Sequence, residues 1–153
     1  MSPRLARILV TLGGLGDKRP CPGTFASAAA LALTAVLPHT WLLTAALVLA
    51  GAVIFGAACG AYLRSLPSGT LNKDPSEVVA DEAVGIWITF LGVPFTPLTV
   101  PVGFVLFRFF DIAKPYPVSR MEKLPGVWGI FLDDAVAGLL ANVLLQVLVR
   151  FVP

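Results

Sequence analysis

Long stretches of this chain contain no charged residue. Asp, Glu, Lys and Arg are absent from residues 20–63, 83–107 and 135–149. Because the hydrocarbon core of a bilayer is about 30 Å thick, a perpendicular helix needs roughly 20 apolar residues to cross it. The 153 residues are 57% apolar and 13% charged, whereas an average soluble domain is about 45–50% apolar and about 25% charged. The sequence therefore predicts one all-α membrane domain, residues 1–153, rather than a soluble enzyme.

Proline and glycine divide these stretches into separate predicted helices, because proline removes a backbone donor and ends a helix. A Pro-His-Thr break at residues 38–40 splits the first stretch into a shorter and a longer run, and three prolines between residues 94 and 101 interrupt the second. We expect a polytopic helical bundle with about five hydrophobic passes, some of them too short to span a flat bilayer.

The basic residues favour one membrane topology, since Lys and Arg tend to stay on the cytoplasmic side. If residues 83–107 form a hairpin that returns to its starting side, ten of the eleven basic residues share one side and only Arg150 faces the other. A single crossing gives seven against four instead. We therefore expect the hairpin, with the N-terminus and all nine acidic residues in the cytoplasm and the C-terminus outside.

The remaining composition excludes several classes of function. With 11 basic and 9 acidic residues the net charge is +2, which is too balanced for a nucleic-acid partner. The two cysteines, Cys21 and Cys59, are predicted to be inert rather than zinc ligands or a disulfide. The one histidine, His39, is predicted on the outer loop, far from every acid. That position excludes histidine-dependent catalysis.

The acidic residues stand where the predicted helices begin or end. The segment D-P-S-E at residues 74–77 predicts a helix start, with Asp74 as N-cap and Glu77 able to reach back to it. This helix would place Glu77 and Asp81 on one face and carry Asp81 and Glu82 one to two turns into apolar surroundings. A carboxylate at membrane depth is costly, and by default it is paired, faces a cavity or marks a functional site.

Three further acids raise the same question: Asp111 at the end of an apolar run, and Asp133 and Asp134 at the predicted head of the last helix. Acids in the first turn complement the helix dipole, which could account for the last two alone but not for Asp111. Neighbouring carboxylates repel one another unless cations lie among them. The natural candidate is Mg²⁺, a hard cation that takes oxygen ligands.

A glycine-rich stretch, residues 13–25, is compatible with a loop that cradles phosphate. Glycines allow close backbone approach, Lys18 and Arg19 supply positive charge, and Thr24 can cap the next helix. The stretch lacks the G-K-[ST] ending of a P-loop, so a plain turn stays open as the alternative.

Taken together, three motifs resemble the phosphatidylglycerophosphatase A family over nearly the whole chain. They are G-L-G-D-K-R-P-C-P-G-T-F-A-S at 14–27, K-D-P-S-E-V-V-A-D-E-A-V-G-I-W at 73–87, and R-F-F-D-I-A-K-P-Y-P-V-S-R-M-E at 108–122 followed by G-V-W-G-I-F-L-D-D-A-V-A-G at 126–138. One departure is Cys21, where a small residue such as Ala is expected. The resemblance implies an enzyme of the bacterial cytoplasmic membrane that uses Mg²⁺ to hydrolyse a phospholipid partner, phosphatidylglycerophosphate, to phosphatidylglycerol and inorganic phosphate.

The resemblance also implies roles for individual residues. The implied metal ligands are Asp81, Glu82, Asp111, Asp133 and Asp134, of which Asp81, Asp111 and Asp134 are also the implied catalytic residues. The residues expected to bind the substrate phosphate are Arg108, Lys114, Lys73 and Thr24, with Asp74 and Glu77 in support. Gly85 and Gly138 fit as positions where helices approach closely.

Several alternatives stay open. Mg²⁺, as one ion or two, could activate an attacking water, or an Asp could attack phosphorus and form an aspartyl-phosphate. A small membrane transporter or ion-handling protein is the competing class, although such proteins place ionisable groups near the middle of their spans. A phosphatase of another lipid phosphate is also possible, because nothing in the sequence recognises the glycerol. The sequence does not indicate the oligomeric state.

Overall fold

The computed structural model describes residues 1–67 and 75–151, and every regular element within these ranges is helical. The elements are α1 (Pro3–Val10), the 3-10 turn η1 (Leu15–Asp17), α2 (Pro22–Ala35), α3 (Trp41–Ser65), α4 (Ala80–Thr89), α5 (Thr99–Ala113), α6 (Val118–Met121) and α7 (Val127–Phe151). The prediction of an all-α fold is confirmed for the described part of the chain.

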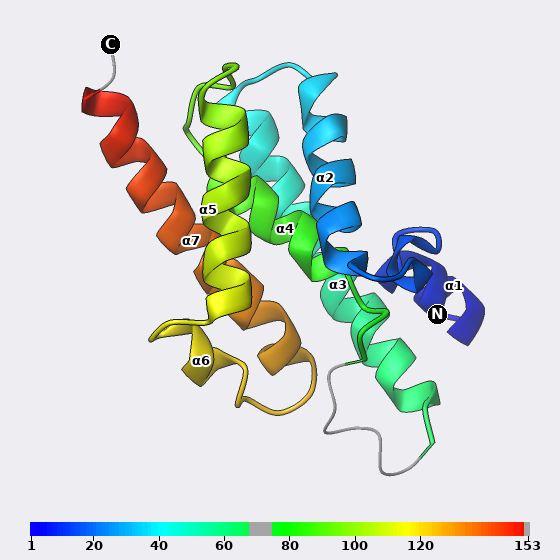
Figure 1. The fold of residues 1–153 in the computed structure, drawn as a ribbon. Helices are drawn as coiled ribbons and strands as arrows, with labels where there is room; N and C mark the ends of the chain where they lie inside the picture. The colour runs from blue at the N-terminus through cyan, green and yellow to red at the C-terminus, as the bar shows by residue number, and fades with distance from the viewer. Residues whose placement is uncertain (68–74, 152–153) are drawn as a thin grey trace.

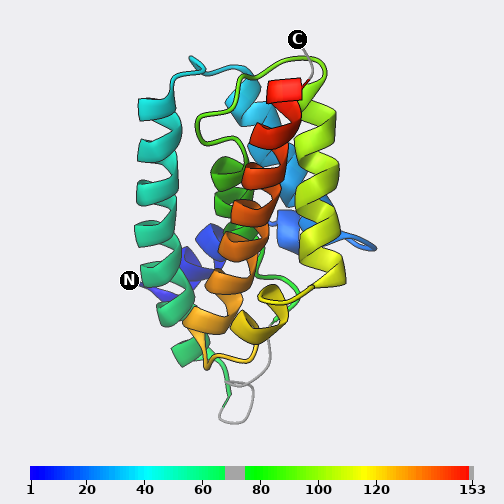
Figure 2. The same cartoon turned by 90° about the vertical axis from the view of Figure 1, so that its left-hand side faces the viewer.

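The short helix α4 lies at the centre of the bundle, packed against α2, α3 and α7 (Figures 1 and 2). Helix α5 packs on α7 at the outside, and α1 packs on α3. Helices α4 and α7 run upward in Figure 1, whereas α3 and α5 run downward. The beginnings of α4 and α7 therefore lie at the same end of the bundle as the end of α5, which brings residues of distant motifs together.

Two apolar clusters hold this arrangement. One lies between α2, α4, α5 and α7 and includes the fully buried Ile86, Phe107 and Leu145. The other joins α1 to α3 through Val10 and Phe55. Burial of such side chains contributes about 1.5–3 kcal/mol each. Helix α4 belongs to the first cluster, and most of its residues are buried.

Glycines and one asparagine fix α4 against α7. A Cβ added at Gly138 would collide with the carbonyl oxygen of Gly85, so the predicted close approach at these two residues is confirmed. One turn further along, the Asn142 Nδ2 donates hydrogen bonds of 2.9 Å to the carbonyl oxygens of Thr89 and Leu91. These are carbonyls at the C-terminal end of α4 that have no partner within the helix.

The expectation of about five passes is wrong. Within the described residues only α3 and α7, each 25 residues long, are long and apolar enough to cross a membrane. Helices α2, α4 and α5 have 14, 10 and 15 residues, so at 1.5 Å per residue they reach only about 15–22 Å. The breaks around residues 38 and 90–98 shorten these helices below the thickness of a bilayer core.

Residues 90–98 separate α4 from α5, and the chain reverses direction there (Figure 2). This is the geometry that the hairpin interpretation of residues 83–107 requires. The exposed apolar residues Leu49 and Val53 on α3, and Leu139 and Val143 on α7, leave large apolar surfaces outside the bundle. Such surfaces on long apolar helices suggest that the protein associates with a membrane.

The predicted helix start at residues 74–77 is also wrong. Helix α4 begins at Ala80, after the N-cap residue Val79, and residues 75–79 form a turn at 76–77 followed by an irregular segment. The Val79 amide donates to the carbonyl of Val10 at 2.9 Å, so this segment is bound to the end of α1 instead of being the first turn of α4. Glu77 therefore does not share a helix face with Asp81.

Candidate functional site

Five carboxylates gather where α4, α5 and α7 meet. We call them the acid cluster: Asp81, Glu82, Asp111, Asp133 and Asp134. The Asp134 carboxylate interacts electrostatically with each of the other four, although they come from three helices. The antiparallel order of the helices explains this, because the beginning of α4 and the end of α5 both lie beside the first turns of α7. The structure thus brings these five predicted site residues to one end of the bundle.

Arg108 links two helices within the acid cluster. Its Nη1 lies 2.6 Å from the Glu82 Oε2 on α4 and 2.9 Å from the Asp111 Oδ2 on α5. All three side chains are about 15% exposed. Ion pairs at this depth bind more strongly than surface pairs, but each charge also costs more to desolvate. Arg108 was expected to bind phosphate, and the structure places it where a phosphate and two carboxylates would share one cation.

Lys114 makes the second link. Its Nζ lies 2.8 Å from the Asp133 Oδ2 on α7 and 2.9 Å from the Glu122 Oε1 beyond α6. The residue ends α5 in the left-handed conformation with φ 43° and is followed by Pro115, which cannot continue the helix. A non-glycine residue in this conformation costs about 1–2 kcal/mol. The two ion pairs offset that cost and hold the ammonium group beside the acid cluster.

Ser27 and Gly23 of α2 complete the wall beside Glu82. The fully buried Ser27 Oγ donates to the Glu82 Oε2 at 2.8 Å and accepts from the Arg108 Nη1 at 3.4 Å. A Cβ at Gly23 would overlap the Glu82 carboxylate, so only glycine lets α2 approach this closely. Sequence reasoning gave Ser27 no role. The signal available was its position one turn after Thr24 in the first motif.

Two pKa shifts follow from this geometry. Burial raises the pKa of Glu82 to about 7, although Arg108 favours the ionised form and lowers it. Burial lowers the pKa of Lys114, but its hydrogen bonds with Asp133 and Glu122 outweigh this effect and raise the pKa above its usual value. Lys114 therefore carries its positive charge at any physiological pH.

Asp133 and Asp134 lie deeper than the sequence suggested. Helix α7 begins at Val127, so the two acids occupy its second turn instead of its head. Both are only 4% exposed, and Asp81 is 5% exposed. Because the dipole effect falls off within the first turn of a helix, it does not account for carboxylates at this position. Complementation of the helix dipole therefore does not explain why these two acids are present.

Other predicted site residues lie elsewhere. Thr24 is the third residue of α2 and does not cap it, because the N-cap is Cys21 and no side chain caps this end. Glu77 accepts a hydrogen bond of 2.7 Å from the Tyr62 hydroxyl. A Cβ at Gly16 would collide with the carbonyl of Glu77, so the glycine-rich loop packs on this backbone. Lys73 and Asp74 lie outside the described residues.

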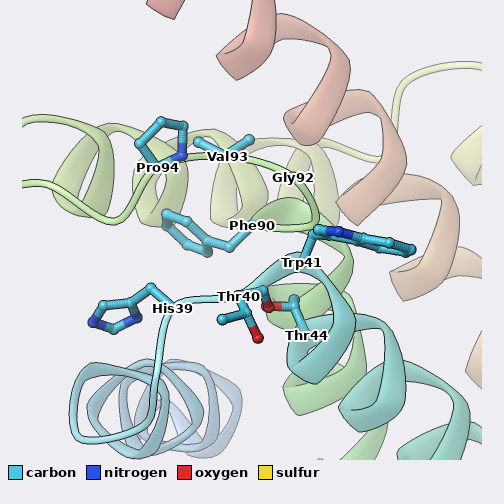
Figure 3. A pocket seen from close by; sticks show the side chains of 8 residues that line it. All are labelled: His39, Thr40, Trp41, Thr44, Phe90, Gly92, Val93 and Pro94. Atoms are coloured by element: carbon cyan, nitrogen blue, oxygen red, sulfur yellow. The ribbon is translucent and has the colours of Figure 1, made fainter.

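The opposite end of the bundle has a different character. A pocket of about 320 Å³ lies between the loop that precedes α3 and the turn after α4, lined by residues that include His39, Thr40, Trp41 and Phe90 (Figure 3). The His39 ring stacks on Phe95 with centroids 4.5 Å apart. As predicted, the histidine lies far from the acids. Of the two cysteines, Cys21 is exposed and Cys59 is buried.

In the described ranges, no three His, Cys, Asp or Glu side chains converge closely enough to hold a metal ion by themselves. The acid cluster nevertheless offers oxygen donors only, and with Glu122 its six carboxylates meet the cations Arg108 and Lys114. Acidic side chains therefore outnumber the cations that they contact. This donor chemistry fits Mg²⁺, which one or two carboxylates commonly hold together with water and substrate phosphate.

Comparison with known proteins places the chain in a family. The phosphatidylglycerophosphatase A family pattern matches residues 8–149. A Bacteroides thetaiotaomicron protein named "Putative phosphatidylinositol-3-phosphatase" is 39% identical, over 95% of this chain and 94% of its own length. The phosphatidylglycerophosphatases A of Haemophilus influenzae and Escherichia coli are 36% and 35% identical, each over 84% of this chain and over 78% and 74% of their own lengths.

No solved structure matches the chain. The family pattern covers the acid cluster, both linking cations and Ser27. These matches favour an enzyme over an ion-handling protein and confirm the resemblance inferred from the three motifs. The chain belongs to the phosphatidylglycerophosphatase A family and is a phosphatase of that family.

Proposed function

We propose that this protein hydrolyses the terminal phosphomonoester of phosphatidylglycerophosphate to give phosphatidylglycerol and inorganic phosphate. One observation carries the proposal. The acids and cations of separate motifs meet at one end of the bundle, where Arg108 links Glu82 to Asp111 and Lys114 binds Asp133. Cations that are held among carboxylates can orient a doubly charged phosphate. A carboxylate can accept the proton of an attacking water or attack phosphorus itself.

The chain's own residues would divide the work as follows. The phosphate oxygens would compete with the carboxylates for Arg108 and Lys114, which are charged donors suited to phosphate. The bond between phosphorus and the glycerol oxygen would break as a new oxygen bonds to phosphorus, and the departing glycerol oxygen would take up a proton from a protonated carboxyl group of the acid cluster. That oxygen would come from water, with a buried Asp accepting its proton, or from an Asp that forms an aspartyl-phosphate, which water then hydrolyses.

Mg²⁺ is part of this proposal. Asp81, Asp134 and their neighbours in the acid cluster would hold it, because they are buried oxygen donors in a site where acidic side chains outnumber cations. When bound, Mg²⁺ supplies charge neutralisation for the phosphate and lowers the pKa of a bound water.

The test is phosphate release by purified protein in detergent. The panel contains phosphatidylglycerophosphate, phosphatidic acid and phosphatidylinositol 3-phosphate, each with Mg²⁺ and with a chelator. We expect the fastest release from phosphatidylglycerophosphate, and loss of release when the metal is removed. Release that is unchanged by the chelator would contradict the Mg²⁺ part, and no release from any substrate would contradict the function itself.

A second candidate substrate is phosphatidylinositol 3-phosphate. It is favoured by the printed name of the Bacteroides thetaiotaomicron relative, which matches nearly the full length of both chains. Both substrates present a phosphomonoester on a diacyl lipid, and the acid cluster has no described contact that would distinguish glycerol from inositol. The same panel separates them, because the preferred substrate has the higher kcat/KM.

We also propose that the protein lies in the bacterial cytoplasmic membrane with the acid cluster facing the cytoplasm. The two long apolar helices and the basic-residue asymmetry support this orientation. Val118 is itself fully buried, so the inner position is tested at the neighbouring exposed Tyr116. Cysteines introduced at Pro97 and Tyr116 in a background without the native cysteines would be labelled from opposite faces. Labelling of both from one face would overturn the hairpin topology.

A further inference from the structure

A shallow groove of about 330 Å³ runs along the outer face of α5. Its walls are Phe104, Val105, Arg108, Phe109, Ile112 and Ala113. Val105, Phe109 and Ile112 are 63%, 58% and 71% exposed, so the described chain leaves them uncovered. Their spacing of four and three residues places them on one face of the helix. Apart from one arginine, the groove is therefore an apolar surface.

The position of α5 explains why this face is open. The helix packs on α7 and touches α4 and α2 at its inner side, and Figure 2 shows it at the edge of the bundle. At 15 residues it is about 22 Å long. An exposed stripe of valine, phenylalanine and isoleucine on such a helix needs an apolar occupant.

Arg108 indicates what that occupant is. The same residue lines the groove and holds Glu82 and Asp111 of the acid cluster, so the groove is continuous with the candidate site. Its guanidinium is a charged donor suited to anionic oxygens, and it lies beside the exposed apolar residues of the same helix. The fitting ligand has an apolar body and an anionic or ester oxygen next to it.

We propose that this groove holds an acyl chain of the lipid phosphate, and that the substrate reaches the acid cluster sideways from the membrane along α5. This inference rests on the proposed function. With the acyl chain beside Val105 and Phe109, the first polar atoms of the lipid lie at Arg108 and the phosphomonoester continues toward Lys114. The groove is thus a binding subsite for the apolar part of the substrate.

The experiment blocks the groove without touching a charged residue. Val105→Trp fills it, and the matched control Val53→Trp adds the same ring to α3, at a residue 73% exposed and outside the groove. Both variants are assayed with dioleoyl phosphatidylglycerophosphate in detergent. We expect the KM of Val105→Trp to rise about tenfold, the loss expected when about two methylenes lose their contacts, with kcat within about twofold. Val53→Trp should match the wild type.

A direct readout accompanies the kinetics. A phosphatidylglycerophosphate analogue with a photoreactive group in its acyl chain should label peptides of α5, and unlabelled substrate should compete. Phe109→Ala, which removes one wall instead of filling the groove, should reduce this labelling and raise the KM. If Val105→Trp alters folding, its kcat falls, and Phe109→Ala then decides.

The possible outcomes separate the two proposals. Suppose that the wild type releases phosphate while Val105→Trp and Val53→Trp both have the wild-type KM, or that the photoreactive analogue labels no peptide of α5. Either result would contradict the acyl-chain subsite and leave the proposed function intact. If the wild type acts on no lipid phosphate, the proposed function fails first. A second copy of the chain is the competing occupant. A change in oligomeric mass of Val105→Trp, with kcat and KM both reduced, would show an interface between copies and overturn the subsite.

Discussion

The two ends of the bundle use polar groups in opposite ways. At one end, five carboxylates from three helices are buried around Arg108 and Lys114. At the other, the Asn142 amide donates to backbone carbonyls and His39 stacks on an aromatic ring. The second arrangement pairs these groups with neutral partners, whereas the first brings like-charged groups together. The contacts at the second end serve helix packing, whereas a concentration of buried acids like that at the first is typical of a functional site.

The largest effect should come from the acid cluster. Asp134→Asn removes a buried carboxylate that repels four others, so the fold should persist while phosphate release falls roughly a hundredfold or more. Asp81→Asn and Asp111→Asn should act in the same way. The measurement is Mg²⁺-dependent phosphate release by purified protein. At the other end, His39→Ala should change the rate less than about twofold. Full activity in all three Asp variants would break the comparison.

Arg108→Gln should affect both stability and activity. The change leaves Glu82 and Asp111 buried without their cation, which costs about 3 kcal/mol of unfolding free energy. Thermal unfolding in detergent measures the loss. The control is Arg7→Gln, because the Arg7 and Asp17 side chains are 55% and 46% exposed and such a pair contributes less than about 1 kcal/mol. Equal losses for the two variants would show that burial does not distinguish these ion pairs.

Gly138→Ala separates helix packing from charge. The new Cβ would meet the carbonyl oxygen of Gly85, and backbone cannot move aside easily, so we expect a loss of about 1–3 kcal/mol in unfolding free energy. Gly56→Ala on α3 is the matched control. A Cβ there meets nothing within 4 Å, and the higher helix propensity of alanine should leave stability unchanged or raise it by about 0.5–1 kcal/mol. A neutral Gly138→Ala would mean that α4 and α7 are not held in close contact.

Asn142→Ala should produce the smallest effect. It removes two hydrogen bonds to carbonyls at and just beyond the end of α4 and a third that Gln146 donates to the Asn142 Oδ1, a loss of about 1–2 kcal/mol. The kcat should change less than about twofold, since the acid cluster keeps all its partners. Unfolding and phosphate release measured on the same preparation check this. A rate loss comparable to that of Asp134→Asn would show that the two ends are coupled.

Much of the site could be predicted from local pattern. All five members of the acid cluster stand at the edges of apolar runs, where they could be recognised from the sequence. A charge at membrane depth is costly, so such a residue is usually paired or functional. The pairs of ions could not be predicted in this way. The tertiary arrangement of α4, α5, α6 and α7 decides these pairs. It places Arg108 beside Glu82 and Asp111, and Lys114 beside Asp133 and Glu122.

The errors arose at helix ends. The D-P-S-E segment has good capping chemistry, but the chain forms a turn there because the following backbone binds the end of α1 at Val10. Likewise, Thr24 had the side chain of a cap and lies inside α2. Local capping preferences contribute only about 1 kcal/mol, so tertiary contacts override them readily. The prediction of about five membrane passes was wrong for a related reason, since apolar composition does not reveal where a short helix ends.

By itself, the sequence determined that the chain is helical, that its long uncharged runs suit an apolar environment, and that its acids occupy a few positions at their edges. These properties depend on residue type and spacing. Only the tertiary structure decided that α4 lies enclosed at the centre, that glycines let α7 and α2 approach it, and that Ser27 joins Glu82 and Arg108. Contacts between residues as far apart as Ser27 and Arg108 depend on how the helices pack, which no local pattern specifies.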